Sequence, residues 1–244
     1  MRHAVLSARQ LSVRRSDAFT LTVPNLQFAA GSITCIAGPN GSGKSTLLHC
    51  LVGLLQPDVG TVSLQGQLIT ANLRVTKAAL GYIPDDEEWL IKELTAQEYF
   101  ALLDKIYAEV GVTGCLQRAH TLADTLRFTT FKQQLQYLSH GDKKKVQLIA
   151  GLMHRPAVII IDELRNGLDP LAVIAAESLL QAEAKRGACI IAATHDLWWA
   201  QRVAKSVLLL IDGRVAVHDT TKRLLARHTS IEQLFLSLVQ TTHA

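Results

Sequence analysis

The residues with the clearest chemistry in this sequence stand in one uninterrupted run, residues 38–46, which reads Gly-Pro-Asn-Gly-Ser-Gly-Lys-Ser-Thr. The run fits the spacing G-x-x-x-x-G-K-[ST] at every defined position. Its glycines allow backbone N–H groups to turn inward around an anion, Lys44 brings a positive charge, and the Ser45 hydroxyl is a ligand for Mg²⁺. The run predicts a site for the β- and γ-phosphates of a nucleoside triphosphate, formed by Gly38, Pro39, Asn40, Gly41, Ser42, Gly43, Lys44, Ser45 and Thr46.

The segments on either side of this run have the patterns that such a site needs. Residues 33–37 are a short apolar run typical of a buried strand, and apolar residues recur at helical spacing over 47–55. The positive end of the new helix would then point at the phosphates. A glycine-rich turn that matches the spacing by chance is the alternative, and the strand–loop–helix order disfavours it.

Two later apolar runs also end in residues that suit phosphate chemistry. Residues 157–161 are followed by Asp162 and Glu163, and residues 190–193 are followed by Thr194 and His195. Parallel strands end at the same edge of a sheet, so we expect these side chains beside the phosphate loop. Asp162 would hold Mg²⁺ through water, Glu163 would polarise the attacking water, and His195 would contact that water or the γ-phosphate. Solvated strand-end acids and a core or surface histidine are the alternatives.

The elements that must position these residues follow from the pattern of the whole chain. Short strands are predicted over residues 4–37, at 61–64 and at 80–83, and helical spacing runs with breaks from about 94 to 153. Beyond that, strands and helices alternate, which predicts a parallel sheet covered by helices. With the phosphate loop and the short N-terminal strands, we expect an α/β fold: a P-loop NTPase core with an N-terminal antiparallel strand region. We expect one domain over 1–244, with 1–84 and 154–228 as the core, 85–153 as a helical subdomain and an amphipathic helix in 229–244.

Composition narrows the class of protein further. The 244 residues are 48% hydrophobic and 19% charged, with a formal net charge of +4, which is too weak to indicate a nucleic-acid partner. The densest basic cluster, residues 143–145, is interpreted as a solvated helix face. No apolar run has the length of a membrane-spanning helix. The four cysteines stand far apart and are interpreted as reduced core residues of a cytoplasmic protein.

Taken together, these motifs resemble those of ABC-type ATPase subunits over nearly the whole chain. Residues 138–142, Leu-Ser-His-Gly-Asp, resemble the family signature LSGGQ, and residues 166–170 resemble its D-loop, with Gly167, Leu168 and Asp169. The resemblance implies ATP and Mg²⁺ as cofactors and a head-to-tail dimer of nucleotide domains. It also implies that the signature of one subunit covers the γ-phosphate held by the other, through Ser139, His140, Gly141 and Asp142. An ordinary helix cap is the alternative for the signature taken alone.

The sequence departs from the family pattern at several positions. Asp85 stands where the family usually has a glutamine that meets Mg²⁺. Together with the acids that follow it, Asp85 forms a segment similar to that of a bacterial exporter-type subgroup. An acidic surface loop is the alternative for this segment. Leu164 and Arg165 replace the usual Pro-Thr. We expect Arg165 to point to solvent; an ion pair and an approach to phosphate are the alternatives. Arg15 falls near the position of the aromatic residue that stacks on adenine. Phe19 is not expected to replace that residue, so adenine specificity is implied by the resemblance alone.

The function implied is that of an ATP-binding and ATP-hydrolysing subunit that drives a separate integral membrane permease. We expect a homodimer, export as the direction, and a cytoplasmic location at the inner face of the cell membrane, with no nucleic acid bound. Trp89 and Leu90 would contact a permease helix or pack internally. Two alternatives stay open: a soluble ATPase that acts on nucleic acid or in complex assembly, and a nucleotide-gated module with little turnover.

Overall fold

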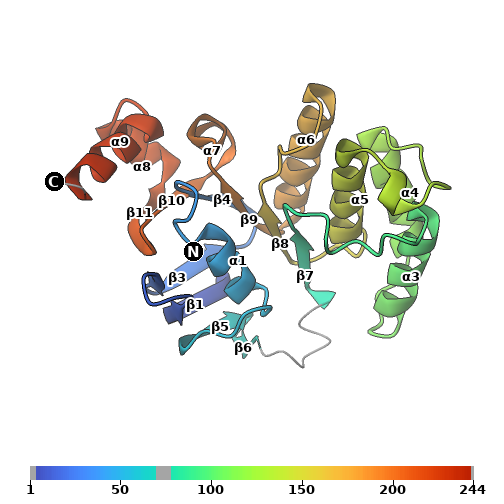
Figure 1. Cartoon of the computed structure of the whole chain (residues 1–244), viewed down its shortest axis with the longest axis horizontal. Coiled ribbons are helices and arrows are strands. Elements are labelled where there is room, and N and C mark those ends of the chain that lie inside the picture. Colours follow the sequence, from blue (N-terminus) through green and yellow to red (C-terminus); the bar gives the residue numbers. More distant parts are fainter. Residues whose placement is uncertain (1–3, 70–77, 243–244) are drawn as a thin grey trace.

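The computed structural model describes residues 4–69 and 78–242 (Figure 1). Within these residues, eleven strands form one mixed sheet in the order β6-β5-β1-β2-β11-β10-β4-β9-β8-β7, with β3 paired to β1 beside this path. The strands are β1 Ala4–Arg14, β2 Thr20–Val23, β3 Leu26–Ala29, β4 Ser32–Ala37, β5 Val59–Leu64, β6 Gln67–Leu68, β7 Leu80–Ile83, β8 Val158–Asp162, β9 Cys189–Thr194, β10 Ser206–Ile211 and β11 Arg214–Thr220. The helices are α1 Lys44–Leu51, α3 Ala96–Ala108, α4 Cys115–Leu126, η1 Leu135–Tyr137, α5 His140–Leu152, α6 Pro170–Arg186, α7 Leu197–Val203, α8 Thr221–Arg227 and α9 Ile231–Thr242.

Five neighbouring strands, β10, β4, β9, β8 and β7, run parallel and form the centre of the molecule. Every residue of β4, β8 and β9 is buried. Successive side chains of a strand point to opposite faces, so Ile159 and Ile161 join the core under α5 and α6 while Ile160 joins the core under α1. This arrangement confirms the predicted parallel sheet, and it shows that helices cover both of its faces.

The N-terminal strands form the antiparallel region that the sequence predicts. Strand β1 pairs antiparallel with β2, β3 and β5. It is eleven residues long, and so is longer than the short strands expected there. Strand β11, which the apolar pattern does not reveal, forms an antiparallel hairpin with β10 and connects this region to the parallel strands.

Helices α3, α4 and α5 lie together at the β7 end of the sheet, whereas α8 and α9 lie on the opposite side of the molecule, near β11 (Figure 1). These three helices occupy the segment in which a helical subdomain is predicted. Helix α3 begins with a capping box, in which Thr95 and Glu98 each bond the other's backbone N–H. Helix α9 packs on α7 with Ile231 and Leu234 buried, and residues 243–244 of the predicted last segment lie outside the described residues.

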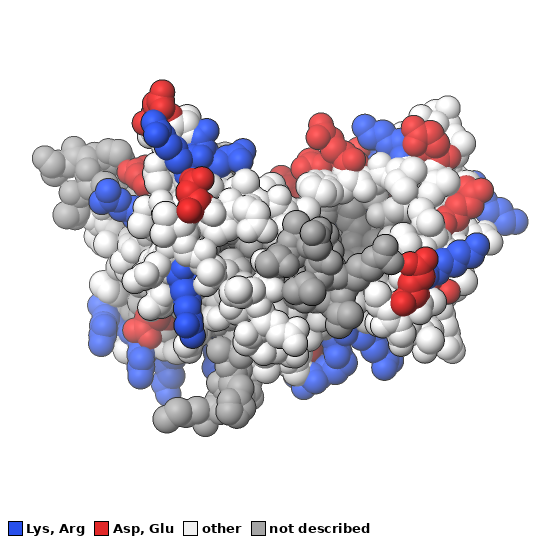
Figure 2. Space-filling model, turned by 90° about the horizontal axis from the view of Figure 1, so that it is seen from below, with Lys and Arg blue, Asp and Glu red and all other residues white. Residues whose placement is uncertain are grey.

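The cysteines lie in the core, as the sequence pattern predicts. All four cysteines are free and buried. No helix in the described part of the chain is long and apolar enough to cross a membrane. On the face shown in Figure 2, basic and acidic side chains are interspersed, as an unspecialised charged surface would be.

Candidate functional site

The phosphate loop joins the buried strand β4 to helix α1, as the sequence predicts. Gly41 and Gly43 have φ values of 78° and 99°, in the left-handed region that favours glycine. A Cβ atom at Gly38 would lie 2.1 Å from the carbonyl oxygen of Leu210, so no larger residue fits there without moving the neighbouring strand. The loop is therefore held in its curved form by backbone contacts on its outer side.

Lys44, the first residue of α1, folds its side chain back over this loop. Its Nζ atom donates hydrogen bonds to the carbonyl oxygens of Gly38, at 2.9 Å, and Pro39, at 3.1 Å. Burial lowers the pKa of Lys44, and the nearby carboxylates of Glu163 and Asp162 oppose that shift. The positive charge consequently stands at the inner surface of the loop, where a phosphate group would bind.

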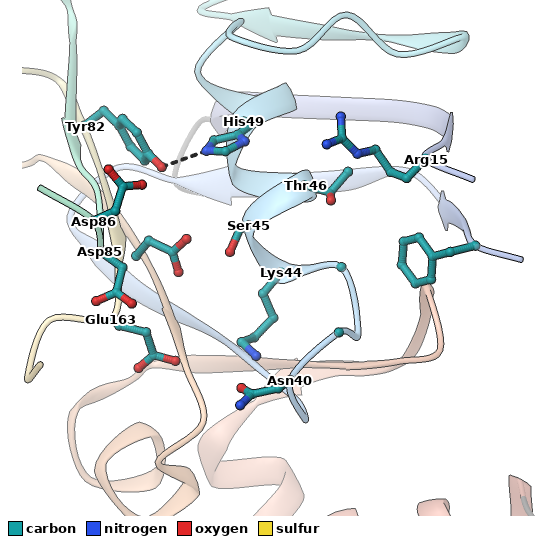
Figure 3. A pocket seen from close by; sticks show the side chains of 14 residues that line it. Arg15, Asn40, Lys44, Ser45, Thr46, His49, Tyr82, Asp85, Asp86 and Glu163 are labelled. Atoms are coloured by element: carbon teal, nitrogen blue, oxygen red, sulfur yellow. Dashed lines mark hydrogen bonds between the residues drawn. The ribbon is translucent and has the colours of Figure 1, made fainter. Parts of the chain in front are cut away.

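The loop forms one wall of a cavity of about 570 Å³. Figure 3 shows Asp85 and Glu163 on the wall opposite α1, with Ser45 and Lys44 facing them. The hydroxyl oxygen of Ser42 is buried without a partner among the described residues. A buried polar atom without a partner at the loop is consistent with a polar ligand there.

Asp162 ends strand β8 deep in this cavity and is 6% exposed. Burial raises the pKa of its carboxyl group and Asp85 adds to the rise, while a hydrogen bond with Ser45 and the charge of Lys144 lower it. Ser45, Asp162 and Asp85 offer oxygen donors only, which is the donor set that Mg²⁺ prefers. The described residues contain no cluster of three or more His, Cys, Asp or Glu that would hold a metal by itself, so phosphate oxygens and water would complete the coordination.

Glu163 and His195 follow neighbouring strands and meet at the carboxyl edge of the sheet. The Nδ1 atom of His195 lies 2.9 Å from Oε1 of Glu163. Glu163 has a φ of 51°, a left-handed conformation that non-glycine residues seldom adopt, and only 12% of its side chain is exposed. The backbone turn directly after β8 thus directs this carboxylate into the cavity.

The predicted signature residues lie outside this cavity. Ser139 is the N-cap of α5 and accepts a hydrogen bond from the backbone N–H of Asp142, as expected. The Nδ1 atom of His140 lies 2.7 Å from Oε1 of Glu87, and a Cβ atom at Gly141 would lie 2.7 Å from the carbonyl oxygen of Gly167. The signature and the predicted D-loop therefore touch each other within one chain, away from the phosphate loop.

Residues 21–166, more than half of the chain, match the family described as ABC transporter. The chain belongs to this family. Its relatives include the cobalt import ATP-binding protein CbiO of Salmonella typhi, 27% identical over 238 residues that cover 96% of this chain and 87% of the relative. They also include the Nod factor export ATP-binding protein I of Paraburkholderia xenovorans, 30% identical over 217 residues that cover 88% of this chain and 71% of the relative.

Solved structures give the same assignment. A structure described as the ATP binding subunit of an ABC transporter is 28% identical, with a TM-score of 0.85, and the match covers 96% of this chain and 99% of that one. The structure of cbiO1 from Clostridium perfringens is 25% identical, with a TM-score of 0.73, and 98% of each chain is covered. The protein is thus an ABC transporter ATP-binding subunit.

One expectation about this ABC subunit's side chains is wrong, and two alternatives are decided. Residues 143–145 do not form a solvated face throughout, because only 1% of the Lys144 side chain is exposed. Arg165 does not simply point to solvent, since its guanidinium forms an ion pair with Asp196. Leu90 is 6% exposed and packs internally, which leaves Trp89, at 47%, as the exposed member of that pair.

Two further cavity residues of the ABC subunit, His49 and Tyr82, are not predicted from the sequence motifs. The Nε2 atom of His49 lies 3.0 Å from the hydroxyl oxygen of Tyr82, and both residues line the cavity. His49 follows Ser45 by four residues on α1, a spacing that places both on one helix face and could have revealed it. Arg15 and Phe19 also line the cavity, so both are available to a bound base.

Proposed function

We propose that this subunit binds ATP with Mg²⁺, hydrolyses it as a homodimer, and drives a separate membrane permease in the direction of export. The observation that carries the proposal is the meeting of Lys44, Asp162 and Glu163 around one cavity, with His195 bonded to Glu163. This arrangement joins a phosphate-binding loop to a carboxylate placed to act on water. It also favours hydrolysis over a module that only binds nucleotide.

In this proposal each residue of the cavity has its own role. Lys44 and the loop N–H groups bind the β- and γ-phosphates, and Glu163 accepts the proton of the attacking water. His195 orients the Glu163 carboxylate through their hydrogen bond. Mg²⁺, held by Ser45, Asp162 and Asp85, would supply positive charge to the phosphate oxygens when bound.

The position of the signature supports a dimer. Ser139, His140, Gly141 and Asp142 do not line the cavity of their own chain. For these residues to contact ATP, they must contact the nucleotide of a second copy. Gly167, Leu168 and Asp169 lie beside the signature of the same chain, so they would share that interface.

Sequence features support export and a permease partner. The acidic segment 85–88 resembles an exporter-type subgroup, and one relative is named as an export subunit, whereas another is named for import. The exposed Trp89 stands directly after this segment, where it would contact a permease helix. A subunit that works in this way would be located at the inner face of the cell membrane.

Two measurements test this function. Purified protein should release phosphate from ATP only when Mg²⁺ is present, and EDTA should abolish the release. The tagged chain should also recover a multi-span membrane protein in comparable amount from detergent-solubilised native membranes. Recovery of soluble proteins or nucleic acid alone, with no membrane protein, would refute the transport role while leaving the ATPase assignment to the first measurement.

A further inference from the structure

Lys144 has an unusual position for a lysine, because its charged end is enclosed. It lies near the start of α5, and its Nζ atom donates hydrogen bonds to the carbonyl oxygen of Pro84, at 2.8 Å, and to that of Asp162, at 3.2 Å. These two acceptors stand at the ends of the adjacent strands β7 and β8. Lys144 therefore connects the helix that carries the signature to both strands that lead into the nucleotide cavity.

A buried ammonium group needs a nearby negative charge, since removal from water otherwise costs several kcal/mol. Oδ1 of Asp85 lies 3.9 Å from Nζ of Lys144, and no closer carboxylate to this ammonium is found in the described residues. Asp85 is held from a second side by Asn166, whose Nδ2 atom donates to the same oxygen at 2.9 Å. Asp85 therefore has a fixed position, although 43% of its side chain is exposed.

The cavity has an excess of negative charge, which a cation such as Lys144 can offset. Four carboxylates line it, whereas two permanently cationic side chains, Lys44 and Arg15, do so. An acid at position 85 adds one negative charge close to Asp162, at a site that must also accept the phosphates of ATP. Lys144 approaches from behind the cavity wall and supplies a positive charge there.

We propose that Lys144 is a positioning residue that compensates the charge of Asp85 and thereby allows an acid to stand beside Asp162 at the metal end of the cavity. This inference rests on the proposed function, because Asp85 matters only if the cavity binds Mg²⁺ and ATP. It explains why a departure from the family's glutamine is tolerated in this chain. It also gives the signature helix a direct bond to the backbone of Asp162.

Neighbouring contacts also hold α5 against the segment that follows β7, but they do not involve Asp85. Glu87 accepts a hydrogen bond from Lys143 at 2.7 Å and lies at the same distance from His140. The amide of Gln147 donates to the carbonyl oxygen of Asp86. These bonds hold residues 86–87 against α5, but none of them reaches Asp85 or Asp162, so charge compensation falls to Lys144.

A charge-pair cycle tests the inference. The variants are Asp85→Gln, Lys144→Gln and the double variant, each assayed for kcat, for KM of ATP and for the Mg²⁺ concentration that gives half of full activity. Each single variant leaves one charge unpaired, so we expect kcat to fall about tenfold in each, and Lys144→Gln to raise the KM of ATP because the uncompensated carboxylate repels the phosphates. The double variant, which has neither charge, should have a clearly higher kcat than either single variant, although it stays below wild type because it lacks the Asp85 carboxylate.

The matched control is Asp85→Gln combined with Lys145→Gln, because Lys145 is the next residue of α5 and bonds Asp142 instead. This pair should show no recovery. The inference would be overturned if the kcat losses of the two single variants multiplied in the Asp85–Lys144 double variant. Equal recovery of kcat in the control pair would also overturn it. If Lys144→Gln does not fold, the kcat of Asp85→Gln is compared with that of the double variant, and a higher kcat in the double variant supports the inference. A double variant that does not fold overturns the inference. A wild-type chain without Mg²⁺-dependent hydrolysis would instead refute the proposed function.

Discussion

Oε1 of Glu163 and Nδ1 of His195 lie 2.9 Å apart at the carboxyl edge of the sheet, although 31 residues separate them in the sequence. The pairing of β8 with β9 explains this, because Asp162 stands directly opposite Ala193 in the register. The residues that follow these two strands must then emerge together. The parallel sheet thus builds a base and its orienting partner from two distant segments.

This contact makes a prediction for Glu163→Gln. Loss of the carboxylate removes the proton acceptor, so the rate of phosphate release should fall at least about 100-fold. ATP binding, measured with a fluorescent nucleotide, should stay within about threefold of wild type, since the phosphate loop is unchanged. His195→Ala is the companion variant and should lower kcat less. Unchanged turnover in Glu163→Gln would remove this residue from the mechanism.

Lys44→Ala should weaken nucleotide binding itself. The ammonium is the positive charge on the loop, and a charge-assisted hydrogen bond contributes about 1.5–3 kcal/mol, which corresponds to a loss of affinity of about 10–100-fold. Equilibrium titration with labelled ATP measures this loss. Lys132→Ala, which removes an exposed lysine that does not line the cavity, is the control and should bind as wild type does. Equal affinities in the two variants would contradict the role of Lys44.

The backbone of the site could be predicted from the sequence because its determinants are local. A glycine-rich run between an apolar strand and an apolar helix is typical of a phosphate-binding loop. Asp162 and Glu163 follow a run of apolar residues that forms a buried strand. The same is true of the N-cap at Ser139, which depends on residues three positions apart. Patterns of this kind need no knowledge of which elements pack together.

The electrostatic contacts could not be predicted, because they depend on which elements meet. Three consecutive lysines resemble a solvated surface, yet a helix turns by about 100° per residue, so their three side chains point in different directions. Lys143 reaches Glu87, Lys144 reaches two strand ends, and Lys145 reaches Asp142. Likewise, Arg165 finds Asp196 only because β8 and β9 are adjacent.

Stability should depend on pH through His154, a buried residue outside the nucleotide site. Burial lowers its pKa from 6.5 to about 4, with Arg118 adding to the shift. Between these two values the unfolded chain binds a proton here and the folded chain does not, so stability falls as the pH is lowered from 6.5 to about 4. The expected loss is about 3 kcal/mol, at about 1.4 kcal/mol per pKa unit.

Urea unfolding at several pH values measures this loss, and His154→Phe isolates the contribution of His154. A phenyl ring can keep the stacking on Tyr107, whose ring lies 4.1 Å away at an angle of 12°. The variant will be less stable at pH 7, because it loses the contact of Nε2 with the carbonyl oxygen of Leu80, at 3.0 Å. Its stability should nevertheless vary less between pH 6.5 and 4 than that of wild type. An identical slope would show that other groups cause the dependence.

The last prediction concerns the packing that places α5 beside the strand leading to Asp85. A Cβ atom at Gly81, in β7, would lie 2.2 Å from the carbonyl oxygen of Gly151, in α5, and a backbone oxygen cannot move aside alone. We expect Gly81→Ala to lower the free energy of unfolding by about 2 kcal/mol, or the thermal midpoint by about 4–8 °C. At Gly151 the nearest atoms belong to the side chain of Ile83, which can shift, and alanine favours a helix by about 1 kcal/mol. Gly151→Ala should therefore lower the free energy of unfolding clearly less than Gly81→Ala, because only Gly81→Ala forces the two backbones apart. Thermal unfolding of the two variants side by side measures the difference.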